Sequence, residues 1–265
     1  MLRHKSHLLS PPWFTCLRLL LVLLAAFLLA RLAPPLVSEA AAPSFTSKTI
    51  LTPTTPGASL FDNPTTLAFG PDGRLYVGQQ NGRIHALTLD AARSVTAVER
   101  FDTIYNTPNK NDDGTPAPGV TGRTLLGIVF DPASPPSAPV LYVTHSDPRI
   151  GYNNSATALA IDTHSGTLTK LTGPNFDSPA NRQDLIIGLP RSRENHGPNG
   201  LAWGPDGWLY GCNGIQAKAW VGPPGTPREG RAYLDCGVWR YHPTRKLFQP
   251  VAHGTTNPFG LDFDD

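Results

Sequence analysis

His196 is a candidate for proton transfer because of its residue type and its setting. It lies in the segment Arg193-Glu-Asn-His-Gly-Pro198. Imidazole accepts a proton near neutral pH. Asn195 can hold one tautomer by a hydrogen bond but cannot stabilise an imidazolium as a carboxylate does, and Glu194 lies one residue further away. The alternative is a loop histidine that packs against the hairpin of Trp203.

Other polar residues give weaker signals. Five further histidines have no partner at ligand spacing and are expected to be structural or surface residues: His85, His145, His164, His242 and His253. Of these, His145 comes directly after a strand pattern, and a second hypothesis is that it lies close to His196. The run Asn109–Gly114 begins like a calcium loop. Val120 stands where such a loop needs its final glutamate, so we expect a polar surface loop.

Cys212 and Cys236 lie at the ends of expected strands. In an oxidising compartment they can form a disulfide, and the alternative is two buried thiols. The chain has no CxxC or CxxCH motif, which excludes a zinc ribbon and covalently attached haem at these residues. The sequon that begins at Asn153 matters only in a eukaryotic secretory pathway.

The elements that must position these residues recur along the chain. The segment Pro64–Gly78 matches Pro198–Cys212 almost position for position, and Leu126–Thr144 is a looser copy. A further start lies at Pro258–Asp265. Each copy begins with a short apolar strand that ends in an aromatic residue, and in the two close copies a Pro-Asp-Gly turn leads into a second strand.

Such repeated antiparallel units predict an all-β fold of the β-propeller type, because no single sheet can bury its own face. Three units look complete and a fourth only begins. We therefore expect an incomplete six-bladed ring, with about three blades plus the start of a fourth. The alternative is that residues 43–265 form a complete β-sandwich.

Composition supports the β interpretation. The chain of 265 residues has 28 prolines, 25 glycines and one methionine, which argues against a helical bundle. The net charge of +2 arises from residues 1–42, and the remainder is near neutral. No basic run is available to neutralise phosphates, so we expect no nucleic-acid partner.

The first 42 residues have the features of an export signal. Arg3 and Lys5 precede an apolar run from Leu19 to Ala30, which is too short to cross a bilayer but matches a signal-peptide core. Small residues near Ala40 offer cleavage sites. We expect residues 1–42 to be a signal peptide or a retained membrane anchor, and residues 43–265 to be an exported domain.

Three stretches carry a family resemblance: Arg193–Gly214, Leu125–Pro132 and Asn257–Leu261. Together they resemble the soluble glucose/sorbosone dehydrogenase propeller family. The stretch Gly222–Phe263 is similar in particular to the related "membrane-bound dehydrogenase" propeller domains of planctomycete-like bacteria. The resemblance covers roughly residues 55–265.

This resemblance implies a six-bladed propeller that binds pyrroloquinoline quinone and calcium where the loops converge. In the family a histidine takes the proton from a sugar hydroxyl while hydride passes to the quinone. The motif places that histidine at His196 and a cofactor-binding asparagine at Asn257. The chain departs from the family at Thr256, where the dehydrogenases carry an arginine, and at Gly122, beside Arg123, where they carry a glutamine.

Three functions remain open at the level of sequence. The first is an exported oxidoreductase that oxidises a sugar or alcohol and passes electrons to an acceptor protein. The second is a non-catalytic propeller that binds carbohydrate or protein, since fold does not fix function. The third is an inactive fragment. His196 and Asn257 favour the first, whereas Gly122 and Thr256 favour the second.

Overall fold

The computed structural model describes residues 61–149, 163–192 and 196–264. The predicted leader at 1–42, the sequon at Asn153, and Glu194 and Asn195 lie outside the described residues. Within those residues, no helix is long and apolar enough to cross a membrane. In the described ranges the regular structure is almost entirely β, and the helical elements there are two short 3-10 turns, Pro179–Asn181 and Arg228–Gly230. The predicted all-β class is confirmed.

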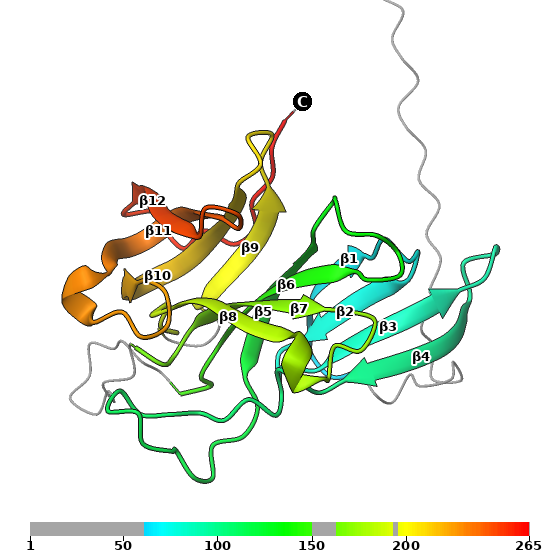
Figure 1. Ribbon diagram of the computed structural model, residues 1–265, viewed down its shortest axis with the longest axis horizontal. Coiled ribbons are helices and arrows are strands. Elements are labelled where there is room, and N and C mark those ends of the chain that lie inside the picture. Colours follow the sequence, from blue (N-terminus) through cyan, green and yellow to red (C-terminus); the bar gives the residue numbers. More distant parts are fainter. Residues whose placement is uncertain (1–60, 150–162, 193–195, 265) are drawn as a thin grey trace, which may run out of the picture. The chain divides into compact units, whose positions relative to one another are not determined.

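The strands form three antiparallel sheets of four strands each (Figure 1). The first sheet contains β1 (Pro64–Phe69), β2 (Leu75–Gln79), β3 (Ile84–Leu89) and β4 (Val95–Phe101). The second contains β5 (Thr124–Phe130), β6 (Val140–Ser146), β7 (Thr167–Thr172) and β8 (Arg182–Ile187). The third contains β9 (Pro198–Trp203), β10 (Leu209–Val221), β11 (Ala232–His242) and β12 (Leu247–His253). In every sheet the strands pair in chain order, as the internal repeat predicts.

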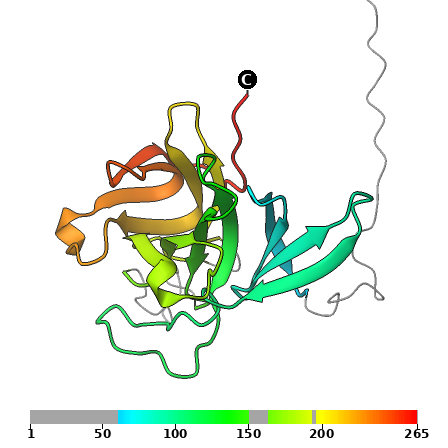
Figure 2. The same cartoon turned by 45° about the vertical axis from the view of Figure 1, so that its right-hand side comes forward.

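The first strands of the three sheets lie side by side. β5 contacts β1 on one side and β9 on the other, and the two views in Figures 1 and 2 agree on this arrangement. Because β1, β5 and β9 are equivalent copies, the segments that lead into them meet at one edge. The residues directly before these strands are Asn63, Arg123 and Gly197.

A recurring aromatic pair joins each sheet to the start of the next unit. The pairs are Tyr76–Phe130 at 4.7 Å, Tyr142–Trp203 at 5.5 Å and Tyr210–Phe263 at 5.0 Å between ring centroids, all edge to face. Trp203 also donates a hydrogen bond from Nε1 to the carbonyl of Phe130 at 2.8 Å. Edge-to-face packing adds stability to the area that each ring buries. The aromatic residues that mark the sequence repeat therefore hold consecutive units together.

The Pro-Asp-Gly turns have the same local chemistry in the first and third sheets. Gly73 and Gly207 adopt φ values of 79° and 76°, where glycine carries no steric cost. The preceding aspartate accepts a hydrogen bond from a tyrosine hydroxyl of the following strand at 2.8 Å in both copies. The turn residues thus fix the hairpin and also orient the tyrosine that packs on the next unit.

Candidate functional site

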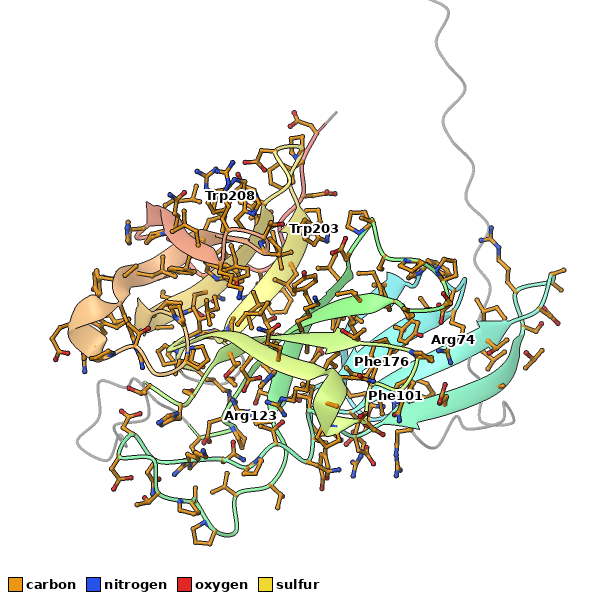
Figure 3. The ribbon with its side chains drawn as sticks, in the orientation of Figure 1. Arg74, Phe101, Arg123, Phe176, Trp203 and Trp208 are labelled. Atoms are coloured by element: carbon orange, nitrogen blue, oxygen red, sulfur yellow. The ribbon has the colours of Figure 1, made fainter. Side chains whose placement is uncertain are left out.

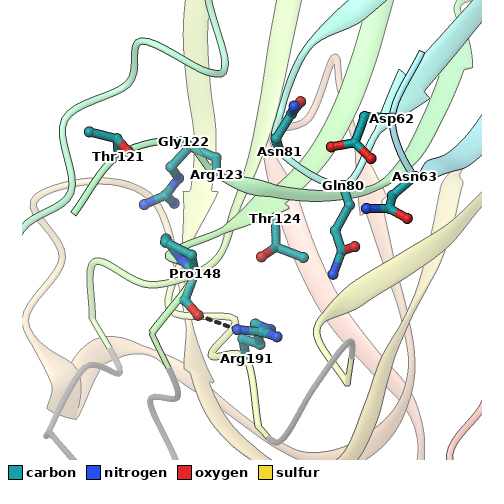
Figure 4. Close-up of a pocket in the computed structure, with 10 residues that line it drawn as sticks. All are labelled: Asp62, Asn63, Gln80, Asn81, Thr121, Gly122, Arg123, Thr124, Pro148 and Arg191. Carbon is teal, nitrogen blue, oxygen red and sulfur yellow. Dashed lines mark hydrogen bonds between the residues drawn. The ribbon is translucent and has the colours of Figure 1, made fainter.

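A polar pocket of about 260 Å³ opens where the segments leading into the first strands meet the adjoining turns (Figure 4). Its lining residues are Asp62, Asn63, Gln80, Asn81, Thr121, Gly122, Arg123, Thr124, Pro148 and Arg191. They come from the approaches to β1 and β5, the β2–β3 turn, and the segments after β6 and after β8. All but the glycine and the proline have side chains that donate or accept hydrogen bonds.

Close backbone contact fixes the wall between the first two sheets. The carbonyl of Asn81 accepts the Arg123 amide at 3.1 Å, and the carbonyl of Gln80 accepts the Leu125 amide at 3.3 Å. Gly122 has φ 75°, and a Cβ there would lie 2.9 Å from the Asn81 carbonyl oxygen. The loop therefore requires glycine at position 122. The glutamine that the resembling dehydrogenases carry at this position would not fit here.

Arg123, labelled in Figure 3, is the most deeply buried charged residue among those that line the pocket. Its Nε donates to His145 Nδ1 at 3.1 Å, one Nη donates to the Asn109 side-chain oxygen at 2.7 Å, and the other to the carbonyl of Ser165. All three acceptors are neutral. Burial lowers the pKa of Arg123 to about 10.

His145 extends this network in one direction. Because its Nδ1 accepts from Arg123, its Nε2 carries the proton and donates to the Thr169 hydroxyl at 2.8 Å. Thr169 in turn donates to the Asp184 carboxylate at 2.7 Å. Burial, and then the charge of Arg123, hold the pKa of His145 well below its ordinary value. His145 is therefore a structural histidine in contact with Arg123, and the alternative in which it approaches His196 gains no support from these contacts.

His196 and Asn257 lie on either side of one irregular segment of β10. The β10–β11 pairing is interrupted between Asn213 and Lys218. There a Cβ on Gly214 would lie 2.8 Å from the His196 Cα, so the histidine backbone packs directly on this glycine. The Ile215 amide, released from the ladder, donates to Asn257 Oδ1 at 3.3 Å.

The histidine ring has a distinctive environment. His196 is half-buried, and its Nδ1 is buried without a hydrogen-bond partner within the described chain. Its carbonyl accepts the Ser192 amide at 3.2 Å. Neither His196 nor Asn257 lines the polar pocket, although the neighbouring Arg191 does. The resemblance thus pointed to two residues that contact one segment of β10, and it named Gly122 and Arg123, which line the pocket, but the sequence did not predict the pocket's other residues.

Two of the expected cofactor positions lack the side chain that the resembling family carries there. Gly122 has no side chain to offer, Thr256 is exposed where an arginine would be needed, and the Asn257 oxygen is bonded to the backbone. Among the described residues, no group of three His, Cys, Asp or Glu side chains could hold a metal ion such as calcium. The run Asn109–Gly114 lies largely at the surface as expected, with Lys110, Asp113 and Gly114 exposed, but its first residue is buried against Arg123.

Cys212 and Cys236 are both free and buried. The Cys236 thiol donates to the Thr255 carbonyl at 2.8 Å. Burial, together with the neighbouring Cys236, raises the pKa of Cys212 to about 11. The sequence left open a disulfide or two buried thiols, and in the structure both residues are buried thiols.

Comparison with known proteins adds one match. A family model described as a domain of unknown function, DUF7133, matches residues 161–265. The matched region contains the third sheet, His196 and Asn257, whereas most of the residues that line the polar pocket precede it. No curated protein matches the chain.

Proposed function

We propose that the chain forms part of a β-propeller of the six-bladed type, and that the polar pocket on its loop face binds a carbohydrate. Support for the propeller comes from three equivalent four-stranded sheets whose first strands pack side by side. Propellers place ligand sites where loops converge, and here the approaches to β1 and β5 converge on the pocket.

The chemistry of the lining carries the proposal. A sugar hydroxyl both donates and accepts hydrogen bonds, and each carboxamide offers both functions at one side chain. Three of the lining residues are carboxamides, Asn63, Gln80 and Asn81, and the Asn81 oxygen already accepts the Arg83 amide at 3.0 Å. Ordinary small-molecule pockets are mostly apolar and measure about 300–1,000 Å³. A smaller pocket with this polar lining favours a single sugar ring over a larger apolar ligand.

A matched pair of variants tests this binding. Gln80→Met removes a donor and an acceptor from the pocket while it keeps the length of the side chain. Gln183→Met makes the same change at an exposed position of β8. Saturation-transfer NMR with a panel of monosaccharides should detect a binder, and the first variant should weaken it about fivefold, corresponding to about 1 kcal/mol. Equal affinities for both variants and the wild type would remove the pocket from consideration.

A second candidate is the oxidation of a sugar or alcohol, with transfer of electrons to an acceptor protein. The unpartnered Nδ1 of His196 favours it, because a buried ring nitrogen without a partner is available to exchange a proton with a ligand. The test is sugar-dependent dye reduction in the presence of quinone and calcium, lost on His196→Ala. If the sugar binds but no dye is reduced, oxidation is rejected and the carbohydrate-binding proposal stands.

A further inference from the structure

A second pocket, of about 240 Å³, lies between the outer strands of the second sheet and the long connection from β4 to β5. Its lining residues are Thr107, Pro108, Lys110, Arg123, His164, Thr167, Arg182, Asp184 and Ile187. Arg123 is the residue that it shares with the first pocket. The proposed carbohydrate function makes no use of this second pocket.

Positive charge exceeds negative charge in the lining. Lys110, Arg123 and Arg182 are cations, whereas Asp184 is the one carboxylate among the lining residues. Arg182 is paired with Asp184 at 3.0 Å and also donates to the Thr107 hydroxyl. This pairing leaves two positive charges in the lining without a carboxylate partner there.

Arg123 and Lys110 are those two charges. The guanidinium of Arg123 bonds only neutral acceptors among the described residues. Two carboxylates act on it through space, and each is paired with another arginine: Asp147 with Arg149 at 2.8 Å and Asp184 with Arg182 at 3.0 Å. Across the described chain, the Lys110 ammonium makes no hydrogen bond or ion pair with a side chain. Leaving a buried guanidinium without a counter-ion is costly, and an anion in contact with it would offset that cost.

The pKa of His164 is consistent with the same excess of positive charge. Burial, and then the charge of Lys110, lower its pKa below the ordinary value. Asp112 opposes this shift, while Arg231 and Arg123 add to it. The ring therefore faces more positive than negative charge from the elements packed around it.

We propose that this second pocket binds an oxyanion, held by Arg123 and Lys110. Arg123 uses three of its five N–H groups on neutral acceptors, which leaves two that can donate to a carboxylate, sulfate or phosphate, and the Lys110 ammonium adds a compact charge. The anion is either a free inorganic ion or the acidic group of a sugar. These two sources share the same chemistry and are separated by the test below.

Two variants that change the charge of the pocket in opposite directions provide the test. Lys110→Gln removes a cation whose side chain supports no other described contact, and it should weaken binding about fivefold. Asp184→Asn removes the lining carboxylate while it keeps an oxygen for Thr169 and Arg182, and it should strengthen binding by a similar factor. Lys246→Gln, at an exposed turn of the third sheet, is the matched control and should change nothing.

The measurement is isothermal titration of the full chain with sodium sulfate, sodium phosphate and glucuronate at constant ionic strength. NMR shifts of the Thr167 and Ile187 amides locate the site. Tighter binding of glucuronate than of sulfate and phosphate identifies an acidic sugar, and the reverse identifies a free ion. The proposal is overturned if none of the three anions saturates the site, or if Lys110→Gln and Lys246→Gln weaken binding equally. It is also overturned if Asp184→Asn fails to tighten binding.

Discussion

Acidification should destabilise this protein through two buried histidines, His85 and His145. Neither side chain is exposed to solvent. Burial, and then the charge of Arg100, lower the pKa of His85 to about 4, and the pKa of His145 is held well below its ordinary value. In the unfolded chain both rings titrate near pH 6.5. Below that pH both histidines of the unfolded chain become protonated, whereas in the folded chain they stay neutral.

The sign and size of the effect follow from this difference. Because both pKa values are depressed in the folded state, the stability is present above pH 6.5 and is lost as the pH falls toward 4. Between pH 7 and pH 5, His85 should lower the free energy of unfolding by about 2 kcal/mol, and His145 should lower it further in the same direction. A typical domain is stable by only about 5–15 kcal/mol, so this loss is large.

The contacts of His85 explain why its ring stays neutral. Gln79 accepts the Asp62 amide on its side-chain oxygen at 3.0 Å, which turns its amide nitrogen toward His85 Nδ1 at 2.7 Å. The amide nitrogen can only donate, so Nδ1 must accept and cannot carry a proton. A proton on Nδ1 would break this contact. Because Gln79 also positions Asp62 at the wall of the first pocket, acidification should loosen that wall as well.

Urea unfolding at pH 7 and pH 5 measures the effect. The wild type should lose more than about 2 kcal/mol between these values, and His85→Gln should lose about 2 kcal/mol less than the wild type. His242→Gln, at the end of β11, reports the effect of removing a histidine elsewhere. The reasoning fails if His85→Gln keeps the full dependence on pH, because the proton would then be taken up by other groups.

Three further variants test individual contacts. Gly122→Ala should lower the free energy of unfolding by about 1–3 kcal/mol in urea titrations, since φ 75° and the Asn81 carbonyl both oppose a Cβ; an unchanged midpoint would contradict the loop geometry. Trp203→Phe should cost about 1–3 kcal/mol in thermal unfolding, because it leaves the Phe130 carbonyl without its donor; a loss of less than 0.5 kcal/mol, by the same scale, would mean that the bond contributes little. Cys212 should react with Ellman's reagent at pH 8 far more slowly in the folded than in the unfolded protein, because burial raises its thiol pKa to about 11; equal rates would show that the site is open.

The repeated hairpins could be predicted from the sequence because their signals are local. A Pro-Asp-Gly turn between two apolar strands specifies its own geometry, and the glycine φ values of 79° and 76° agree with it. The aromatic residue that ends the first strand of each copy, such as Phe130 and Trp203, likewise marked positions that join consecutive units. The turn is specified within a few residues, whereas the aromatic positions are specified by the internal repeat.

The pocket and the Arg123 network could not be predicted in this way. Arg123 is a single cation before a strand, and its partners Asn109, His145 and Ser165 come from separate segments that meet only in the folded chain. The loop that begins at Asn109 lies largely at the surface as expected, but Asn109 itself is buried because its side-chain oxygen accepts from Arg123. No local pattern encodes that contact.

The most direct test of the carbohydrate-binding proposal is to map which backbone amides respond when a bound sugar is added to the labelled protein. The proposal predicts that the largest NMR shifts fall on Asn81, Thr121 and Thr124, which line the first pocket. Shifts confined to His196 and Ile215 would contradict it, and would place the ligand at the irregular segment of β10 instead.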